Sequence, residues 1–116
     1  MKTHKQLDVW IQVMALVKMI YVVTSTFPRE EMFGLTSQMR RAAVSIPSNT
    51  AEGAGRSGSK EFAHFLDIAR GSLAELDTQF EITQMLNYLS PDPLITQQLN
   101  SVGALLTGLK KSIKGL

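Results

Sequence analysis

Three glycines in the segment AEGAGRSGSKEF, residues 51–62, have the spacing of a loop that could bind a dinucleotide. Gly53, Gly55 and Gly58 form a G-x-G-x-x-G pattern, and such a loop holds a pyrophosphate against the N-terminus of a helix. In that motif an acid that binds the ribose follows about twenty residues later, and Asp77 stands close to that distance. The pattern therefore raises the question of whether the protein is a nucleotide-binding enzyme.

The chain offers few other residues that could carry catalysis. It has no cysteine and two histidines, His4 and His64, which do not form an H-x-x-x-H pair. Thiolate metal sites and disulfides are therefore excluded, and the sequence has no pattern of a nucleophile beside a base. Carboxylates such as Glu52 and Glu75 could do acid–base work, but pairing with a cation is their plainer role. We expect no cofactor, no metal and no enzymatic activity.

Four segments with the hydrophobic spacing of helices must position these residues. They are expected from Leu7 to Thr24, from Leu35 to Gly55, from Ser59 to about Leu89, and from the turn at Ser90–Pro93 to the lysine-rich end of the chain. No segment alternates with the period of a strand. Four helices with short connections predict an all-α fold, an antiparallel up-down-up-down four-helix bundle, as one domain spanning residues 1–116.

The glycine-rich segment therefore lies between two expected helices. A dinucleotide loop needs a strand before its first glycine, whereas an Ala- and Ser-rich helix precedes Gly53, and Asp77 falls inside a long helix. We interpret the glycines as helix ends, with Gly53 or Gly55 in the left-handed conformation and Gly58 as the N-cap of the third helix. The nucleotide-binding hypothesis is not favoured.

The first expected helix is apolar over more of its surface than a helix packed on one side requires. Val13 and Ile20 belong to the part that broadens this surface, and we expect some of it to contact a second copy of the chain. The sequence alone does not indicate which side faces the core.

The second expected helix contains a proline. Pro47 lacks a backbone donor and crowds the carbonyl of Ala43, so we expect a kink there. Asn49 is expected to hydrogen-bond a carbonyl that the kink frees. Thr36 or Ser37 is expected to cap the start of this helix.

Two long runs resemble a known family. They are GLTSQMRRAAVSIPSNTAEGAGR, residues 34–56, and EFAHFLDIARGSLAELDTQ, residues 61–79. With LDVW at residues 7–10 and FP at residues 27–28, they are similar to the 23S ribosomal RNA intervening-sequence proteins, also called bacterial four-helix bundle proteins. The resemblance implies a short antiparallel bundle that assembles into a ring-like homopentamer without known catalytic activity. It also implies a relation to the accessory proteins of diversity-generating retroelements, which bind nucleic acid. Gly58 departs from the family, which usually has Ser there.

Two groups of basic residues could bind a partner. Arg40 and Arg41 lie in a region without acids, residues 32–51. We expect one of them to bridge to a carboxylate of the third helix, within or between chains, rather than to contact nucleic acid directly.

The second group lies near the chain's end and at the glycine-rich loop. Its members are Lys110, Lys111 and Lys114, joined by Arg56 and Lys60. They could contact phosphates of RNA or DNA, or the three lysines could simply stabilise the negative end of a helix dipole.

Composition leaves the choice of partner open. A net charge of +2 and a pI of 9.1 permit nucleic acid binding without requiring it. The apolar run from Val9 to Thr24 falls short of the ~20 residues of a membrane span, so a cytoplasmic protein is expected. The leading hypothesis is a non-enzymatic oligomeric scaffold or adaptor that binds RNA or DNA. The alternative is a self-assembling or protein-binding module without a nucleic acid ligand.

Overall fold

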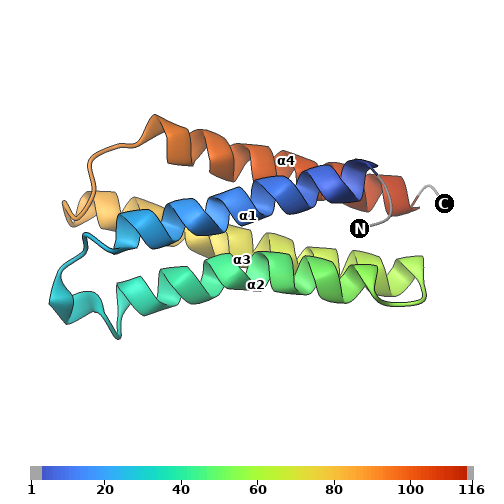
Figure 1. Ribbon diagram of the computed structural model, residues 1–116, viewed down its shortest axis with the longest axis horizontal. Helices are drawn as coiled ribbons and strands as arrows, with labels where there is room; N and C mark the ends of the chain where they lie inside the picture. The colour runs from blue at the N-terminus through green and yellow to red at the C-terminus, as the bar shows by residue number, and fades with distance from the viewer. Residues whose placement is uncertain (1–3, 115–116) are drawn as a thin grey trace.

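The computed structural model describes residues 4–114, which form four α-helices and one short 3-10 helix. The elements are α1 (His4–Thr24), η1 (Arg29–Glu31), α2 (Leu35–Ala54), α3 (Ser59–Met85) and α4 (Pro93–Lys114). None of the described residues belongs to a strand, so the predicted all-α class is confirmed. The helices lie side by side, with the α1–α2 and α3–α4 connections at one end and the α2–α3 connection at the other (Figure 1).

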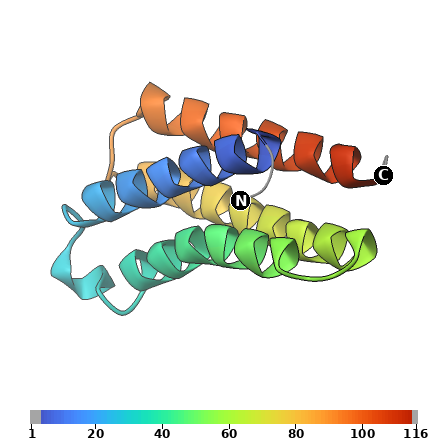
Figure 2. The ribbon, with the colours of Figure 1, turned by 45° about the vertical axis from the view of Figure 1, so that its right-hand side comes forward.

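Each helix packs against two neighbours around one core. The contacting pairs are α1–α2, α2–α3, α3–α4 and α1–α4, and the turned view shows the same neighbours (Figure 2). Core residues recur three and four positions apart because this spacing places side chains on one side of a helix. In α3 the series includes Leu66, Ala69, Leu73 and Leu76, and in α4 it includes Leu99, Val102, Leu106 and Leu109.

Burial distinguishes the two apolar sides of α1. Val9, Val13, Leu16 and Ile20 are at most 1% exposed and belong to the core. The expectation that Val13 and Ile20 contact another chain is therefore corrected, because a single chain already buries both. Within the described residues, Gln6–Thr24 is long and apolar enough to cross a membrane by length and composition alone. The core helix of a soluble protein meets the same criterion.

α2 begins at Leu35 and is capped by a carboxylate from η1. The Leu35 N–H donates to Glu31 Oε1 at 3.0 Å, and Gly34 occupies the N-cap position. Thr36 and Ser37 are therefore not the N-caps that the sequence predicted. A carboxylate at a helix N-terminus also interacts favourably with the helix dipole, so Glu31 stabilises this start in two ways.

Glu31 also joins the two connections at its end of the bundle. The Tyr88 hydroxyl, in the α3–α4 connection, donates to Glu31 Oε2 at 2.8 Å, and the Tyr88 ring lies 5.8 Å from that of Phe27 between centroids. The bond from the backbone of Leu35, and then that from Tyr88, lower the pKa of Glu31 from its ordinary value. The same contact raises the pKa of Tyr88.

α2 continues through Pro47, which is buried. Asn49 Nδ2 donates to the backbone oxygen of Ser45 at 2.8 Å and to its Oγ at 2.9 Å. Asn49 thus bonds a carbonyl of α2, but not that of Ala43, whose usual donor Pro47 lacks. The kink itself stays a prediction.

The glycine-rich segment connects α2 to α3. Its first glycine, Gly53, does not end α2 as expected. Gly53 is buried inside α2, where a Cβ would lie 2.8 Å from Phe65 Cβ and 3.2 Å from the Phe62 carbonyl oxygen. Its lack of a side chain therefore permits the close approach of α3. Gly55, the C-cap, has φ −81°, so the left-handed conformation expected for Gly53 or Gly55 is wrong. Gly58 is the N-cap of α3, as predicted.

α3 ends at Met85, four residues before the predicted Leu89. Asn87 has φ 62°, in the left-handed region that asparagine tolerates better than most residues, and the chain leaves the helix there. Asp92 then caps α4, since its Oδ1 accepts the Leu94 N–H at 3.0 Å.

Candidate functional site

The predicted basic patch is divided by ion pairs. The Arg56 guanidinium lies 3.2 Å from Glu52 Oε1 and 3.9 Å from Glu61 Oε2, and its Cζ is 5.0 Å from the centre of the Phe65 ring. Two carboxylates within 4 Å compensate its charge. Arg56 therefore attracts a phosphate group less strongly than an unpaired arginine would.

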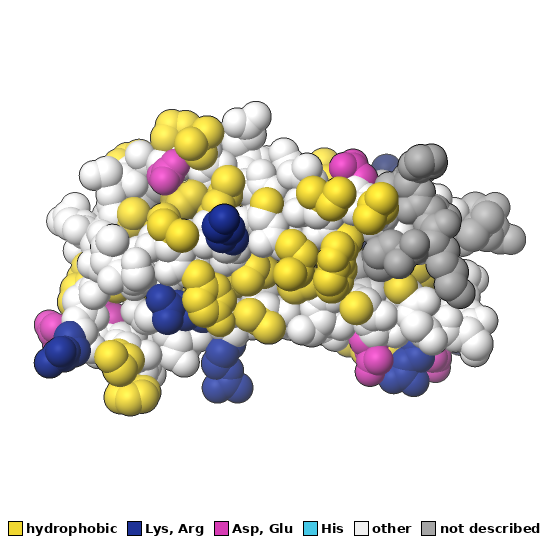
Figure 3. Space-filling model, viewed as in Figure 1, with side chains coloured by type: hydrophobic (Ala, Val, Ile, Leu, Met, Phe, Trp, Pro, Cys, Tyr) yellow, Lys and Arg dark blue, Asp and Glu magenta, His cyan; other side chains and the backbone are white. Residues whose placement is uncertain are grey.

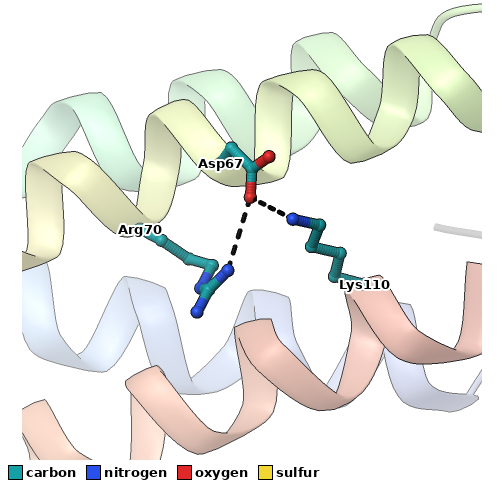
Figure 4. A network of polar contacts seen from close by, with 3 residues as sticks. All are labelled: Asp67, Arg70 and Lys110. Carbon is teal, nitrogen blue, oxygen red and sulfur yellow. Dashed lines mark hydrogen bonds and ion pairs between the residues drawn. The ribbon is translucent and has the colours of Figure 1, made fainter.

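Lys110 has a carboxylate partner as well. Its Nζ donates to Asp67 Oδ1 at 2.6 Å, and Arg70, one turn further along α3, approaches the same oxygen at 3.4 Å (Figure 4). The Lys110 hydrogen bond is the main reason that the pKa of Asp67 is lowered from its ordinary value. This contact ties α4 to α3 and leaves the lysine side chain 20% exposed.

Two members of the predicted patch remain available. Lys60 and Lys111 are exposed, and neither forms an ion pair with another side chain described in this structure. The side chain of Lys114 lies outside the described residues. The predicted five-residue patch thus contains two exposed lysines without carboxylate partners, beside two cations held in ion pairs.

Arg40 and Arg41 have different environments on α2. Arg40 Nε donates to Thr24 Oγ1 at 2.8 Å and Nη2 to the Tyr21 carbonyl at 3.3 Å, and its Cζ lies 4.7 Å from the centre of the Tyr21 ring. Arg40 therefore holds the end of α1 against α2. Arg41 is exposed, and its side chain forms no ion pair or hydrogen bond with residues 4–114.

The predicted bridge from Arg40 or Arg41 to an acid of α3 is thus absent from the described part of a single chain. Of the acids considered for pairing or acid–base work, Glu52 pairs with Arg56, and Glu75 Oε1 accepts a bond from Gln79 Nε2 at 3.4 Å. The two carboxylates have separate partners. The bridge between two chains stays a prediction, as does the role of Arg41 in it.

A cationic groove runs between α1 and α2. It is lined by Tyr21, Ser37, Arg40, Arg41 and Val44 and has a volume of about 530 Å³. No carboxylate lines this groove, so it presents positive charge beside apolar surface.

The outer side of α1 carries an apolar stripe, which we call the α1 ridge. It consists of Leu7, Ile11, Met14 and Tyr21, which are 48%, 53%, 44% and 41% exposed, with Lys18 between the last two. Steps of four and three residues place these side chains on one side of the helix. Apolar side chains gather along α1 and its border with α2 in Figure 3. The sequence contained this stripe, but only burial shows that it faces outward.

The acidic side chains of residues 4–114 have structural roles where their partners are visible. No three His, Asp or Glu side chains in that range gather where they could hold a metal ion. The carboxylates with lowered pKa, Glu31 and Asp67, owe the shift to bonds that join helices and connections. Both have structural partners that explain their position.

Comparison with known proteins places the chain in a family. The model of the family "23S rRNA-intervening sequence protein" matches residues 5–111. A solved structure from the S23 ribosomal protein family of Bacteroides thetaiotaomicron VPI-5482, a protein of unknown function, is 21% identical with a TM-score of 0.53, over 94% of this chain and 91% of that one. At this identity the likeness concerns the fold alone. A search of curated proteins found no match. The relation to retroelement accessory proteins stays a prediction.

Proposed function

The chain belongs to the 23S rRNA-intervening sequence protein family, and we propose that this member is a non-enzymatic, self-assembling scaffold. Its framework is an antiparallel up-down-up-down bundle, which the placement of the three connections supports (Figure 1). The observation that carries the proposal is the α1 ridge. A ring-like homopentamer, implied by the family resemblance, is the assembly we propose.

The α1 ridge supports self-assembly because it is apolar where a solvated helix would be polar. The outer side of a helix on the surface of a monomer normally carries charged and polar residues, and contiguous exposed apolar patches mark interaction sites. On α1, four large apolar side chains stand on the outer side while a second apolar set fills the core. One bundle cannot cover both sides, so a second molecule has to cover the ridge.

Nucleic acid binding is a second candidate function, supported by the exposed lysines. Lys60 and Lys111 have no ion-pair partner in the described chain, and a ring repeats them in every subunit. Repeated weak contacts with phosphates add through multivalency. A cytoplasmic protein with RNA or DNA as its ligand is consistent with the net charge of +2.

The mass of the protein in solution tests the proposal. Sedimentation of the wild type is expected to give a species near five times the 12.8 kDa of the chain. Ile11→Asp places a charge on the ridge and is expected to give single folded chains. Ile68→Asp, at a residue 39% exposed on α3, serves as the matched control and should leave the assembly intact. A wild type that sediments as a single chain at all concentrations would overturn the scaffold proposal.

The same measurement separates the two candidate functions. The wild type is mixed with a pool of short RNA and DNA across a series of salt concentrations. A gain of mass that disappears as salt rises indicates phosphate contacts, and Lys60→Ala with Lys111→Ala should reduce it. An assembly whose mass is indifferent to the pool argues against a nucleic acid ligand and leaves the self-assembling module.

A further inference from the structure

Long stretches of the two sides of the bundle differ in the sign of their charge. Residues 9–28 and 32–51, which form most of α1 and α2, contain Lys18, Arg40 and Arg41 and no acid. Residues 71–109, from the middle of α3 through most of α4, contain four acids and no lysine or arginine: Glu75, Asp77, Glu81 and Asp92. Because α1 contacts α2 and α3 contacts α4, these stretches lie in two different layers of the bundle, whose helices Figures 1 and 2 show. The cations Lys60, Arg70, Lys110 and Lys111 of α3 and α4 lie outside the acidic stretch.

The acidic side contains a groove with a floor of small residues. This α3/α4 groove has a volume of about 480 Å³ and is lined by Gly71, Ala74, Gly103 and Ala104, with Asp77 and Arg70 as its charged residues. Arg70 lies 3.4 Å from Asp67 Oδ1, whereas Asp77 forms no ion pair with the residues that the structure describes. A Cβ built on Gly71 would meet nothing within 4 Å, so the surface there is open. Small residues on facing helices let another helix approach closely, since interaxial distance depends on the side chains at the contact.

We infer that the α1 ridge of one copy docks into the α3/α4 groove of the next copy, with Lys18 facing Asp77. The inference rests on the proposed self-assembly and names the surface that covers the ridge. Large side chains of the ridge fit a floor of small ones, and a cation meets the acid of the groove. The exposed, unpaired Arg41 belongs to the same cationic side and faces the acidic side of the neighbour.

The dimensions of the two surfaces suit such an interface. From Leu7 to Tyr21 the ridge covers fourteen residue steps, or about 21 Å at 1.5 Å per residue. The bundle measures 46 × 25 × 18 Å, so its long sides have room for the ~800 Å² per partner of a standard interface. The two surfaces are different patches of the same chain, which makes the contact heterologous. Such contacts close into a ring when the rotation between neighbours permits.

A pair of complementary variants tests the inference. Ile11→Glu damages the ridge and keeps the groove, whereas Ala104→Arg fills the groove at an exposed residue and keeps the ridge. Each variant alone is expected to sediment as a single chain. An equimolar mixture is expected to form a two-chain species, because the intact groove of the first binds the intact ridge of the second and no free pair of surfaces remains.

Charge reversal provides a second, independent test. Asp77→Lys should weaken assembly at least tenfold in apparent dissociation constant, and Lys18→Asp in the same chain should restore part of that loss. Glu30→Lys makes the same change in net charge at an exposed residue of η1 and should leave the assembly unchanged. Circular dichroism of each variant should match that of the wild type, so that a loss of assembly is distinguished from a loss of fold.

The outcomes separate this inference from the proposed function. An Ala104→Arg variant that assembles like the wild type, while Ile11→Glu still gives single chains, would overturn the groove as partner and leave self-assembly standing. A mixture of folded variants that contains only single chains would also overturn it. A wild type without assembly would overturn both proposals.

Discussion

Gly53 offers the sharpest test of how α2 and α3 pack. In Gly53→Ala the new Cβ would lie 2.8 Å from Phe65 Cβ, 3.0 Å from Phe62 Cδ1 and 3.2 Å from the Phe62 carbonyl oxygen. The Phe62 ring can turn, but the backbone oxygen and Phe65 Cβ can retreat only if α3 moves. Overpacking of this kind destabilises by about 1–3 kcal/mol. Alanine gains up to ~1 kcal/mol over glycine inside a helix, and less at Gly53, which lies in the last turn of α2.

The net expectation is a loss of about 1–2 kcal/mol in the free energy of unfolding. Gly108→Ala is the matched control, because a Cβ there meets nothing within 4 Å and should add about 0.5–1 kcal/mol through helix propensity. Urea unfolding followed by circular dichroism, at one total protein concentration, measures both. If Gly53→Ala stabilises as much as Gly108→Ala, the close approach of α2 and α3 does not require glycine, and the reasoning is refuted.

Four further predictions concern polar side chains. Arg40→Met should lower the free energy of unfolding by about 1.5–3 kcal/mol because it removes charged hydrogen bonds that include the one to Thr24. Arg41→Ala, at an exposed residue without such bonds, should change single-chain stability by under about 0.5 kcal/mol yet weaken assembly; an unchanged mass would contradict its intermolecular role. Folding lowers the pKa of Glu31, so its stabilisation exists above the ordinary glutamate pKa and is lost as pH falls through the lowered one. Glu31→Gln should flatten this acid dependence in urea titrations, and an unchanged pH profile would contradict it. Gln79 Oε1 is buried and accepts no hydrogen bond from the described residues, while Nε2 donates a long 3.4 Å bond to Glu75 Oε1. Gln79→Met should therefore raise the free energy of unfolding by about 1 kcal/mol; a lower value would indicate that Oε1 has a partner.

The hydrophobic period predicted the helices because packing uses the same period. The four predicted helices are confirmed, and their starts at Leu35 and Ser59 agree with the structure. The sequence did not predict the cap of α2, because the capping residue, Glu31, lies four residues before Leu35 in η1 and not at the start of the helix. The sequence predicted the end of α3 several residues too far along the chain. The helix ends before Asn87, which has a positive φ, and the spacing of hydrophobic residues does not reveal such a conformation.

The candidate surfaces depended on facts that one sequence does not contain. On α1 the set with Val13 and Ile20 and the set with Ile11 and Met14 are both apolar, and the packing of the neighbouring helices shows that the first is buried. The ion pairs that divide the basic patch could not be predicted for a different reason. Lys110 and Asp67 are 43 residues apart, and their pairing follows from the register of α4 against α3. The positions of charged residues along the chain do not indicate how α4 is placed along α3.

Lys18 explains why the ridge should prefer the opposite side of a neighbour over a copy of itself. Two ridges packed together would bring two copies of Lys18 into one apolar interface, close to the cationic groove of each chain, which contains Arg40 and Arg41. Like charges at short range repel, and removing them from water without a partner is unfavourable. Docking on the acidic side places the same lysine opposite a carboxylate. The charge that weakens the symmetric pairing therefore strengthens the head-to-tail one, and direction in the assembly follows from one residue in an otherwise apolar stripe.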